Sequence, residues 1–106
     1  MSTIHIDIGK EFGDSLGPRF RKLGDHSGEE FRDDMLEPAF LKAETVVIHL
    51  DAIKTFSASF FEEAFGGLAR KYGSKATLAK VRFSAVQRAY LIPMIQEWMT
   101  DVEMPA

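Results

Sequence analysis

The sequence contains no cysteine among its 106 residues. It can form no disulfide, no thiolate nucleophile and no cysteine-ligated metal site, and it suits a reducing compartment. We expect that compartment to be the cytoplasm, because the N-terminal stretch MSTIHIDIGKEFG is interrupted by charges and lacks the apolar core of a signal peptide. No apolar run approaches the roughly 18–20 residues that span a bilayer, so no membrane partner is expected.

An excess of positive charge is also missing. The chain has 13 Lys and Arg against 16 Asp and Glu, a net charge of -3, so no overall positive field exists to attract nucleic acid. Apolar residues make up 45% and charged residues 27%, the usual balance of a folded globular protein. The length suits one domain, which we expect to cover residues 1–106.

Three helix starts are predicted by a Ser followed three residues later by Glu or Gln, because such a pair can satisfy free backbone N–H groups reciprocally. The pairs are Ser27 with Glu30, Ser59 with Glu62, and Ser84 with Gln87.

Apolar residues at helical spacing follow each of these starts. The first helix is expected over residues 28–43, broken or bent near Pro38. The second follows Ser59 and ends at Gly73, a residue type that often terminates helices. The third covers residues 85–99, with a kink at Pro93.

Three segments between these helices have the patterns of strands. TIHIDI at residues 3–8 alternates apolar and polar side chains, and TVVIHL at 45–50 is almost continuously apolar, as in a central strand covered on much of both faces. TLAKVRF at 77–83 reads as a third, more exposed strand. The alternation of strands and helices predicts parallel pairing of the last two strands and leaves the partner of the first open. Residues 9–27 predict a short hairpin or a functional loop.

Ser57 and Ser59 lie where the second strand leads into the second helix, with Asp51 nearby. Ligands and partners of open α/β sheets meet the protein at this edge. A serine nucleophile needs a base, but His5, His26 and His49 show no suitable spacing and the chain has no G-x-S-x-G elbow, so we expect no catalytic residue. The simplest interpretation makes Ser59 a helix cap. Ser57, upstream of that cap, is then the better candidate for phosphorylation.

The stretch VVIHLDAIKTFSASFFEEAFGGL resembles the central motif of STAS domains, the sulfate-transporter and anti-sigma-factor-antagonist family, in which a strand leads through an Asp-Ser-Ser/Thr-Gly loop into a helix. Together with GPRFRKLGDHSGEEFRDDMLEPAF, it is similar to the STAS-like domains of unknown function found as small bacterial proteins. The resemblance covers about residues 4–98. It implies an α/β fold, the STAS-like βα superhelical sandwich, with a mixed, mostly parallel sheet of 3–5 strands and helices packed against it.

The resemblance further implies a protein without chemistry of its own, regulated by a histidine-kinase-type ATPase that phosphorylates a loop serine. Aligned on the strand, Ser57 stands at the family's Asp, Ala58 at its phosphoacceptor serine, Ser59 at the following Ser/Thr and Phe60 at its glycine. The acceptor itself is therefore missing. Either the switch has moved to Ser57 or Ser59, or the chain has kept the partner surface and lost the phosphorylation.

A second candidate site is the loop GPRFRKLGDHSG. Its side chains Arg19 and Arg21 precede the capped helix start at Ser27 and Gly28, where backbone N–H groups can bind an anion such as phosphate. The spacing matches neither a P-loop nor G-x-G-x-x-G, and basic residues in polar loops are commonly only solvated.

Two further features concern packing. Gly66 and Gly67 lie inside a predicted helix, where we expect them to allow close packing on the sheet. The C-terminal helix carries more apolar side chains than one face needs, which suits core, homodimer or partner contact; they are Met94, Trp98, Met99 and Met104. The histidines lack ligand spacing, so the sequence predicts neither a metal site nor a cofactor.

We therefore expect a non-enzymatic regulatory module that binds a protein partner, a kinase-like ATPase in the first instance. The alternative is a small ligand-sensing or nucleotide-sensing domain that uses the Arg19–Ser27 loop. An enzyme acting through Ser57 or Ser59 is the third possibility, against which the lack of a paired base argues.

Overall fold

A three-stranded parallel sheet forms the centre of the computed structural model, which describes residues 2–100. The strands are β1 (Thr3–Asp7), β2 (Thr45–His49) and β3 (Val81–Ser84), in the order β1-β2-β3. In register, Ile6 lies opposite Ile48, and Ile48 lies opposite Phe83. The predicted central position of the TVVIHL strand is confirmed, and the first strand pairs with it in parallel. The α/β fold class is confirmed, with three strands that are all parallel in the described part of the chain.

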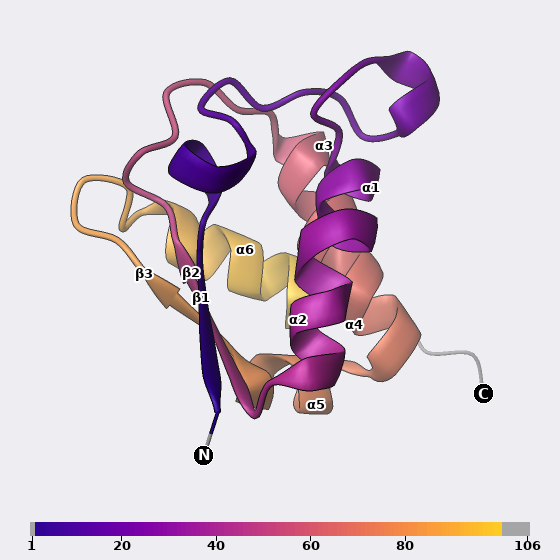
Figure 1. Ribbon diagram of the computed structural model, residues 1–106, viewed down its shortest axis with the longest axis vertical. Helices are drawn as coiled ribbons and strands as arrows, with labels where there is room; N and C mark the ends of the chain where they lie inside the picture. The colour runs from indigo at the N-terminus through magenta and orange to yellow at the C-terminus, as the bar shows by residue number, and fades with distance from the viewer. Residues whose placement is uncertain (1, 101–106) are drawn as a thin grey trace.

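The helical segments alternate with these strands (Figure 1). The helices are α1 (Gly28–Phe31), α2 (Glu37–Lys42), α3 (Ala58–Phe61), α4 (Gly67–Tyr72), α5 (Ser74–Lys80) and α6 (Leu91–Thr100). Wider π-helical turns lie at Ile8–Phe12, Arg32–Leu36 and Glu62–Gly66, and a 3-10 turn lies at Arg21–Leu23. Two of the π-helical turns join α1 to α2 and α3 to α4, so residues 28–42 and 58–72 each form one helical run.

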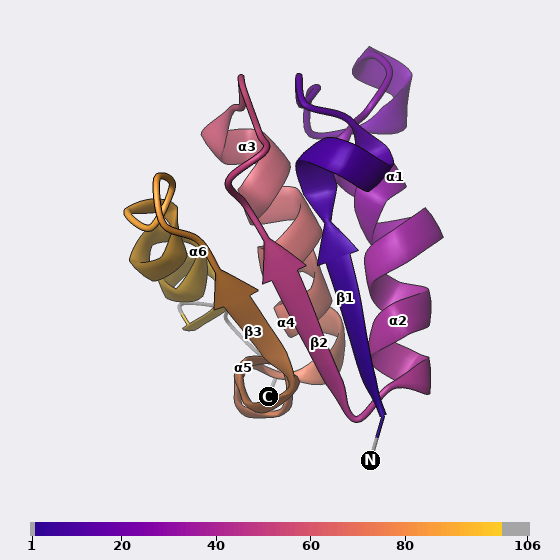
Figure 2. The same cartoon turned by 60° about the vertical axis from the view of Figure 1, so that its left-hand side comes forward.

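All the helices that pack on the sheet lie on one of its faces (Figure 2). Side chains alternate accordingly: Ile6, Val46 and Ile48 are buried beneath the helices, whereas Val47 is only half-buried on the other face. The prediction that β2 is covered on both faces is therefore wrong for this chain. Parallel sheets usually carry helices on both faces, so an open face is unusual for this topology.

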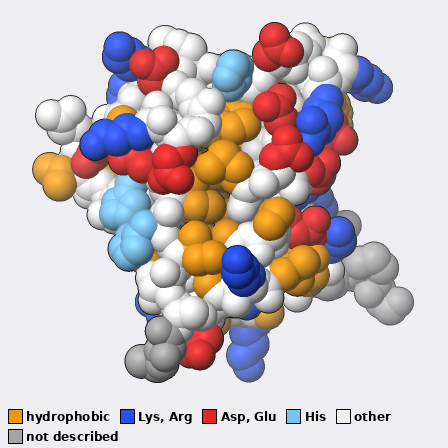
Figure 3. All heavy atoms as spheres, in the orientation of Figure 1, with side chains coloured by type: hydrophobic (Ala, Val, Ile, Leu, Met, Phe, Trp, Pro, Cys, Tyr) orange, Lys and Arg blue, Asp and Glu red, His pale blue; other side chains and the backbone are white. Residues whose placement is uncertain are grey.

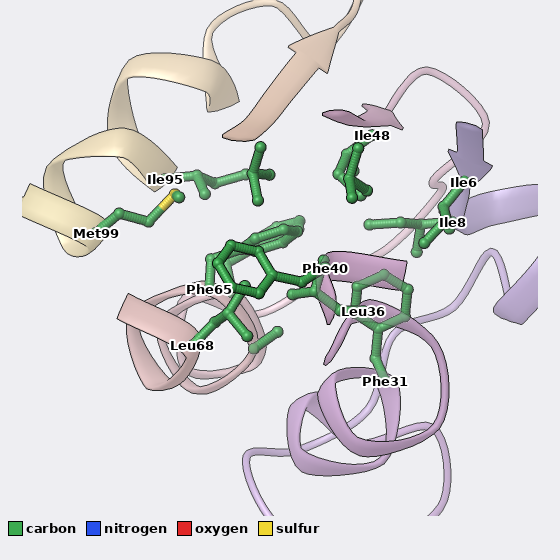
Figure 4. Packing of buried hydrophobic residues seen from close by; sticks show 14 of the residues in the cluster. Ile6, Ile8, Phe31, Leu36, Phe40, Ile48, Phe65, Leu68, Ile95 and Met99 are labelled. Carbon is green, nitrogen blue, oxygen red and sulfur yellow. The ribbon is translucent and has the colours of Figure 1, made fainter. Parts of the chain in front are cut away.

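The core lies between the covered sheet face and the helices (Figure 4). Ile6 and Ile48 point from the sheet toward Phe65 and Leu68 of the second helical run, and Phe31 and Leu36 come from the first run. Five phenylalanines form a chain of ring contacts with centroids 5.2–6.4 Å apart; they are Phe12, Phe31, Phe60, Phe61 and Phe65. Burial of these apolar surfaces is the main term that stabilises the arrangement of sheet and helices.

The predicted third strand is wrong over most of its length. Residues 74–80 form α5, and only the end of TLAKVRF enters β3. Gly73, with φ of 96°, ends α4, and its carbonyl accepts a hydrogen bond of 2.7 Å from the hydroxyl of the buried Thr77. Leu78, Lys80 and Arg82 alternate along this stretch as in a strand, but they span the end of α5 and the start of β3.

The predicted last helix starts too early. Ser84 closes β3 and caps no helix, because α6 begins at Leu91. Val86, which lies within the range 85–99 predicted to be helical, is 84% exposed in the loop before α6. Pro93 is the third residue of α6, in the first turn, where backbone N–H groups have no acceptor within the helix, so the physical reason for the expected kink is removed.

The first predicted helix is confirmed at its start and ends within one residue of the prediction, at Lys42. It continues through Pro38, which follows the π-helical turn Arg32–Leu36 and lies in the first turn of α2. Within residues 2–100, no helix has both the length and the apolar character to cross a membrane. Met104, included above among the apolar C-terminal side chains, lies outside the described residues.

Candidate functional site

The candidate site lies at the carboxyl edge of the sheet, where β2 leads into α3. Ser57 is the residue before α3, with extended backbone, and its Oγ accepts a hydrogen bond of 3.3 Å from the N–H of Phe60. Ser57 therefore caps the helical run 58–72, and the prediction that Ser59 is the cap is wrong. The N–H of Phe60 is free for a side-chain cap, whereas the N–H of Glu62, three residues after Ser59, already donates to the carbonyls of Ala58 and Ser59.

Ser59 lies in the first turn of α3. Its Oγ is 3.2 Å from the Oγ of Ser57, and this is the one hydrogen bond of its side chain among the described residues. Both serines are half-buried. The sequence prediction thus places the two hydroxyls together correctly but exchanges their roles. Ser57 caps the helix, and the hydroxyl of Ser59 makes fewer hydrogen bonds.

The loop that follows β1 packs against this edge. The hydroxyl of Ser57 donates a hydrogen bond of 3.4 Å to the carbonyl of Gly17. The N–H of Leu16 donates to the carbonyl of Thr55 over 2.9 Å, and the N–H of Lys54 donates to the carbonyl of Asp14 over 2.7 Å. The predicted hairpin or functional loop at residues 9–27 is thus an ordered segment bonded to the β2–α3 connection, with its 3-10 turn at the tip of the protruding part (Figure 1).

A network of ion pairs lies one turn along the same helical run. Arg19 from the loop and Arg70 from α4 both bind Glu62. Burial of Glu62 acts to raise its pKa, but hydrogen bonds from Arg70 and Arg19 outweigh burial, so the pKa of this carboxyl lies below its usual range. The same contact with Glu62 raises the pKa of Arg19.

Glu63 is the buried member of the network, at 8% exposure. Its carboxylate accepts a hydrogen bond of 2.5 Å from Arg32 of the first helical run, and its backbone carbonyl accepts another of 2.7 Å from the same guanidinium. Arg19 and Arg70 approach the carboxylate at 3.5 and 3.8 Å. Neither Arg32 nor Glu63 was singled out in the sequence, because no local spacing links residues of two different helices.

Gly66 and Gly67 make room for this network. A Cβ at Gly67 would overlap the guanidinium of Arg32, and one at Gly66 would lie 2.7 Å from Oε2 of Glu62. The expectation that both glycines allow packing on the sheet is therefore wrong. They allow charged side chains from the neighbouring helical run and from their own helix to cross the surface of the run.

Asp51 lies at the same edge of the sheet, but its carboxylate binds a different loop, the one between β3 and α6. Its carboxylate accepts hydrogen bonds of 2.8 Å from the N–H of Val86 and 2.9 Å from that of Arg88. The bonds from Arg88 and Val86 lower the pKa of Asp51. No contact joins Asp51 to either serine within the described chain, so the structure separates it from the serine pair.

The predicted anion-binding residues are all engaged within the chain. Arg19 binds Glu62, and Arg21 pairs with Asp34 at 2.8 Å. At the start of α1, the N–H groups of Gly28, Glu29 and Glu30 donate to the carbonyl of Pro18, the carbonyl of Arg19 and the hydroxyl of Ser27. Ser27 itself is fully buried, and its predicted capping role is confirmed. A pocket of about 400 Å³ at the loop is lined by Phe20, Arg21, Lys22 and Glu29, which gives it a carboxylate as well as cations.

Neither a nucleophilic triad nor a multidentate metal centre is formed by the described residues. No histidine contacts Ser57 or Ser59 there, and no three His, Cys, Asp or Glu side chains gather where they could hold a metal ion. What the edge does offer is two adjacent hydroxyls at a helix start, held against a loop and next to a charged network. This arrangement is suited to modification and recognition.

The comparisons with known proteins identify the family. The STAS-like domain of unknown function matches residues 27–89, which is more than half of the chain and includes β2, the serine pair and the members of the ion-pair network other than Arg19. No curated protein and no solved structure matches the chain. The extent of the family match, on a fold of parallel strands and helices with the serines at the β2–α3 edge, shows that the chain belongs to the family of STAS-like domains of unknown function.

Proposed function

We propose that the chain is a non-enzymatic regulatory module of the cytoplasm that binds a histidine-kinase-type ATPase, which phosphorylates it in the manner of anti-sigma-factor antagonists. The observation that carries this proposal is the pair of hydroxyls, 3.2 Å apart, at the start of the helical run 58–72 in a STAS-like domain. The family match supports a regulatory role, and the resemblance of the β2–α3 connection to the STAS motif supports the kind of partner.

Ser59 is the acceptor that the geometry favours. Its hydroxyl contacts only that of Ser57 among the described side chains, so a phosphate there leaves the bond from Phe60 to the cap intact. A phosphate in the first turn also benefits from the positive end of the helix dipole. Ser57 would lose its cap and its contact with Gly17 on modification. A phosphate on Ser59 therefore changes the charge of the edge while the fold persists.

Arg19 offers the modified serine a cationic neighbour. It binds Glu62 and approaches Glu63, which follow Ser59 by three and four residues, the separations that bring side chains together on one helix face. A phosphate on Ser59 competes with these carboxylates for the guanidinium. Because Arg19 belongs to the loop of residues 9–27, phosphorylation of Ser59 would change the contacts of that loop as well as those of the helix.

The test is to use the purified chain as bait in lysate of its own organism, with wild type, Ser59→Asp and Ser59→Ala compared. We expect wild type and Ser59→Ala to retain a protein with a histidine-kinase-type ATP-binding domain, and Ser59→Asp to lose it. Incubating the recovered pair with ATP should add one phosphate to the wild type and none to Ser59→Ala, as measured by intact mass.

Ser74→Asp is the matched control, because it adds the same charge at the first residue of α5, at the opposite end of the sheet (Figure 1). It should bind like the wild type. Retention of no such ATPase, together with equal binding of all variants to whatever is retained, would overturn the proposal.

A further inference from the structure

The open face of the sheet carries a pair of histidines. Residues that alternate with the buried ones along β1 and β2 point away from the helices, and these include His5 and His49. The register sets His5 opposite Val47 and Asp7 opposite His49, so the two histidines are diagonal neighbours on adjacent parallel strands. The hydrogen-bonded strand pair fixes the distance between their backbones.

The two imidazoles face each other directly. Nδ1 of His5 is 3.0 Å from Nε2 of His49, and the ring centroids are 5.2 Å apart with an interplanar angle of 22°, so the rings meet edge to edge through these nitrogens. His5 is exposed and His49 half-buried. The pair is visible as adjacent pale-blue side chains at the surface of the molecule (Figure 3). In the absence of a metal, one proton between the facing nitrogens makes this contact a hydrogen bond.

The separation of the two nitrogens is close to that of two ligands on one metal ion. Imidazole binds Zn²⁺ at about 2.0–2.1 Å, so two imidazoles at tetrahedral positions have nitrogens about 3.3 Å apart. From the head-on contact at 3.0 Å, each ring must turn by roughly 35° for both lone pairs to meet at one tetrahedral ion. Imidazole is a preferred ligand of Zn²⁺, Cu²⁺ and Ni²⁺, whereas Mg²⁺ and Ca²⁺ prefer oxygen.

We propose that His5 and His49 form a two-histidine site for a divalent transition metal, of the class of Zn²⁺, Cu²⁺ and Ni²⁺, on the open face of the sheet. On binding, Nδ1 of His5 and Nε2 of His49 each donate a lone pair to the ion. The proton that joined them in the neutral pair moves to the outer nitrogen of the ring that carried it. Binding of the ion to the neutral pair therefore releases no proton from the two imidazoles.

The site differs from a closed structural centre. Asp7 lies on the same face, opposite His49, but its carboxylate accepts the N–H of Lys10 at 3.2 Å. With no third ligand gathered there by the described residues, the other positions of the ion are open to water or to a group from another molecule. The sequence could not reveal the site, because 43 intervening residues separate two histidines that share no motif.

Titration of the tag-free 106-residue chain with NiCl₂ and with ZnCl₂ tests the proposal by calorimetry. Wild type should bind one ion per chain. His5→Gln and His49→Gln should each weaken the affinity by more than about tenfold, because even the loss of a ligand's hydrogen-bond partner costs about that much. At one fixed ion concentration above the wild-type Kd, the melting temperature of the wild type should rise by mass action, and that of either variant should rise less.

His26→Asn provides the matched control. His26 is the third histidine; it packs edge-on against Phe12 and has φ of 57°, a conformation that Asn also tolerates. Its replacement should leave the metal affinity unchanged. Far-ultraviolet circular dichroism verifies that each variant is folded. Absence of binding to the wild type, or equal loss of affinity in His26→Asn and His5→Gln, would overturn the assignment of the site.

Discussion

The two adjacent serines differ in what their hydroxyls bind, although they are the same type of residue. Ser57 accepts the Phe60 N–H, contacts the Gly17 carbonyl and lies beside Ser59, so its hydroxyl has three neighbours. Ser59 has one. Capping by Ser57 fixes where α3 begins, and that start determines the side of the helix on which the second hydroxyl lies.

Replacing each serine separately should distinguish these roles. Ser57→Ala removes the acceptor for the Phe60 N–H and should lower the free energy of unfolding by about 1 kcal/mol. Ser59→Ala should change it by less than about 0.5 kcal/mol, as replacements at weakly bonded surface positions do. Urea unfolding followed by circular dichroism measures both values. The reverse order of the two losses would return the cap to Ser59 and remove the reason for preferring Ser59 as phosphate acceptor.

Sequence reasoning reached this edge but could not resolve its details. The apolar strand and the helical stripe after it predicted that Ser57 and Ser59 lie at the carboxyl end of β2, and the structure places them there. The cap was misplaced because Ser59 has a Glu three residues later, whereas the bond that forms uses the backbone N–H of Phe60, which every residue type except proline supplies.

At the scale of elements, the two helical runs are joined by charge as well as by apolar packing. Arg32 and Glu63 both lie in π-helical turns, and the Arg32 guanidinium bonds to the backbone carbonyl and to the carboxylate of Glu63. The same carbonyl also accepts the N–H of Gly67 within the helical run, so it serves a helical donor and an outside donor at once. Gly67 is the position that lets this guanidinium reach across.

Alanine at the two adjacent glycines should therefore give opposite results. Both changes gain roughly 1 kcal/mol of helix propensity. At Gly66 the new methyl meets the ends of Glu62 and Arg70, which can move aside, so stability should be unchanged or higher. At Gly67 it displaces Arg32 from the buried Glu63, and because breaking a buried pair costs more than the propensity gained, we expect a net loss of about 1–2 kcal/mol.

Urea unfolding of Gly66→Ala, Gly67→Ala and Arg32→Met measures this contrast. Arg32→Met in the Gly67→Ala background is the control, since without the guanidinium the alanine should no longer be destabilising. Equal stability of the two alanine variants would mean that the ion pair across the helical runs contributes nothing.

Several elements were predictable because their signals are local, and others were not. Ser27 with Glu30 gave the start of α1, and the glycine at position 73 gave the end of α4. In contrast, residues 74–83 contain too few positions to separate helical from strand periodicity, so α5 was taken for part of a strand. The start of α6 depends on the carboxylate of Asp51, 35 residues before Val86, which holds the loop in another conformation.

At the scale of the whole molecule, local sequence patterns do not predict how many faces of the sheet are covered by helices. β2 is rich in β-branched residues, which predicts a strand but not how many of its faces are covered. The structure buries Val46 and Ile48 beneath the helices and leaves Val47 and His49 on the open face. Whether a second layer exists is decided by where the crossovers pass, and here the crossover helices α1–α2 and α3–α4 lie on the same side (Figure 2).

One pair of substitutions in β2 tests this one-sided architecture. Ile48→Asp places a carboxylate without a partner in the core, where Ile48 is fully buried, and should cost several kcal/mol or abolish cooperative folding. Val47→Asp places the same group on the open face and should cost only about 1 kcal/mol, the range of strand propensities. Thermal and urea unfolding, with concentration varied, measure both variants.

The neighbouring positions share the strand, the substitution and nearly the same original side chain, so the difference between them reports burial alone. If Val47→Asp were as damaging as Ile48→Asp, the open face would have to be covered in solution. A melting temperature of the wild type that rises with protein concentration would then identify a second copy of the chain as the cover. A melting temperature that stays constant, with Val47→Asp folded, leaves His5 and His49 accessible to an ion from solution.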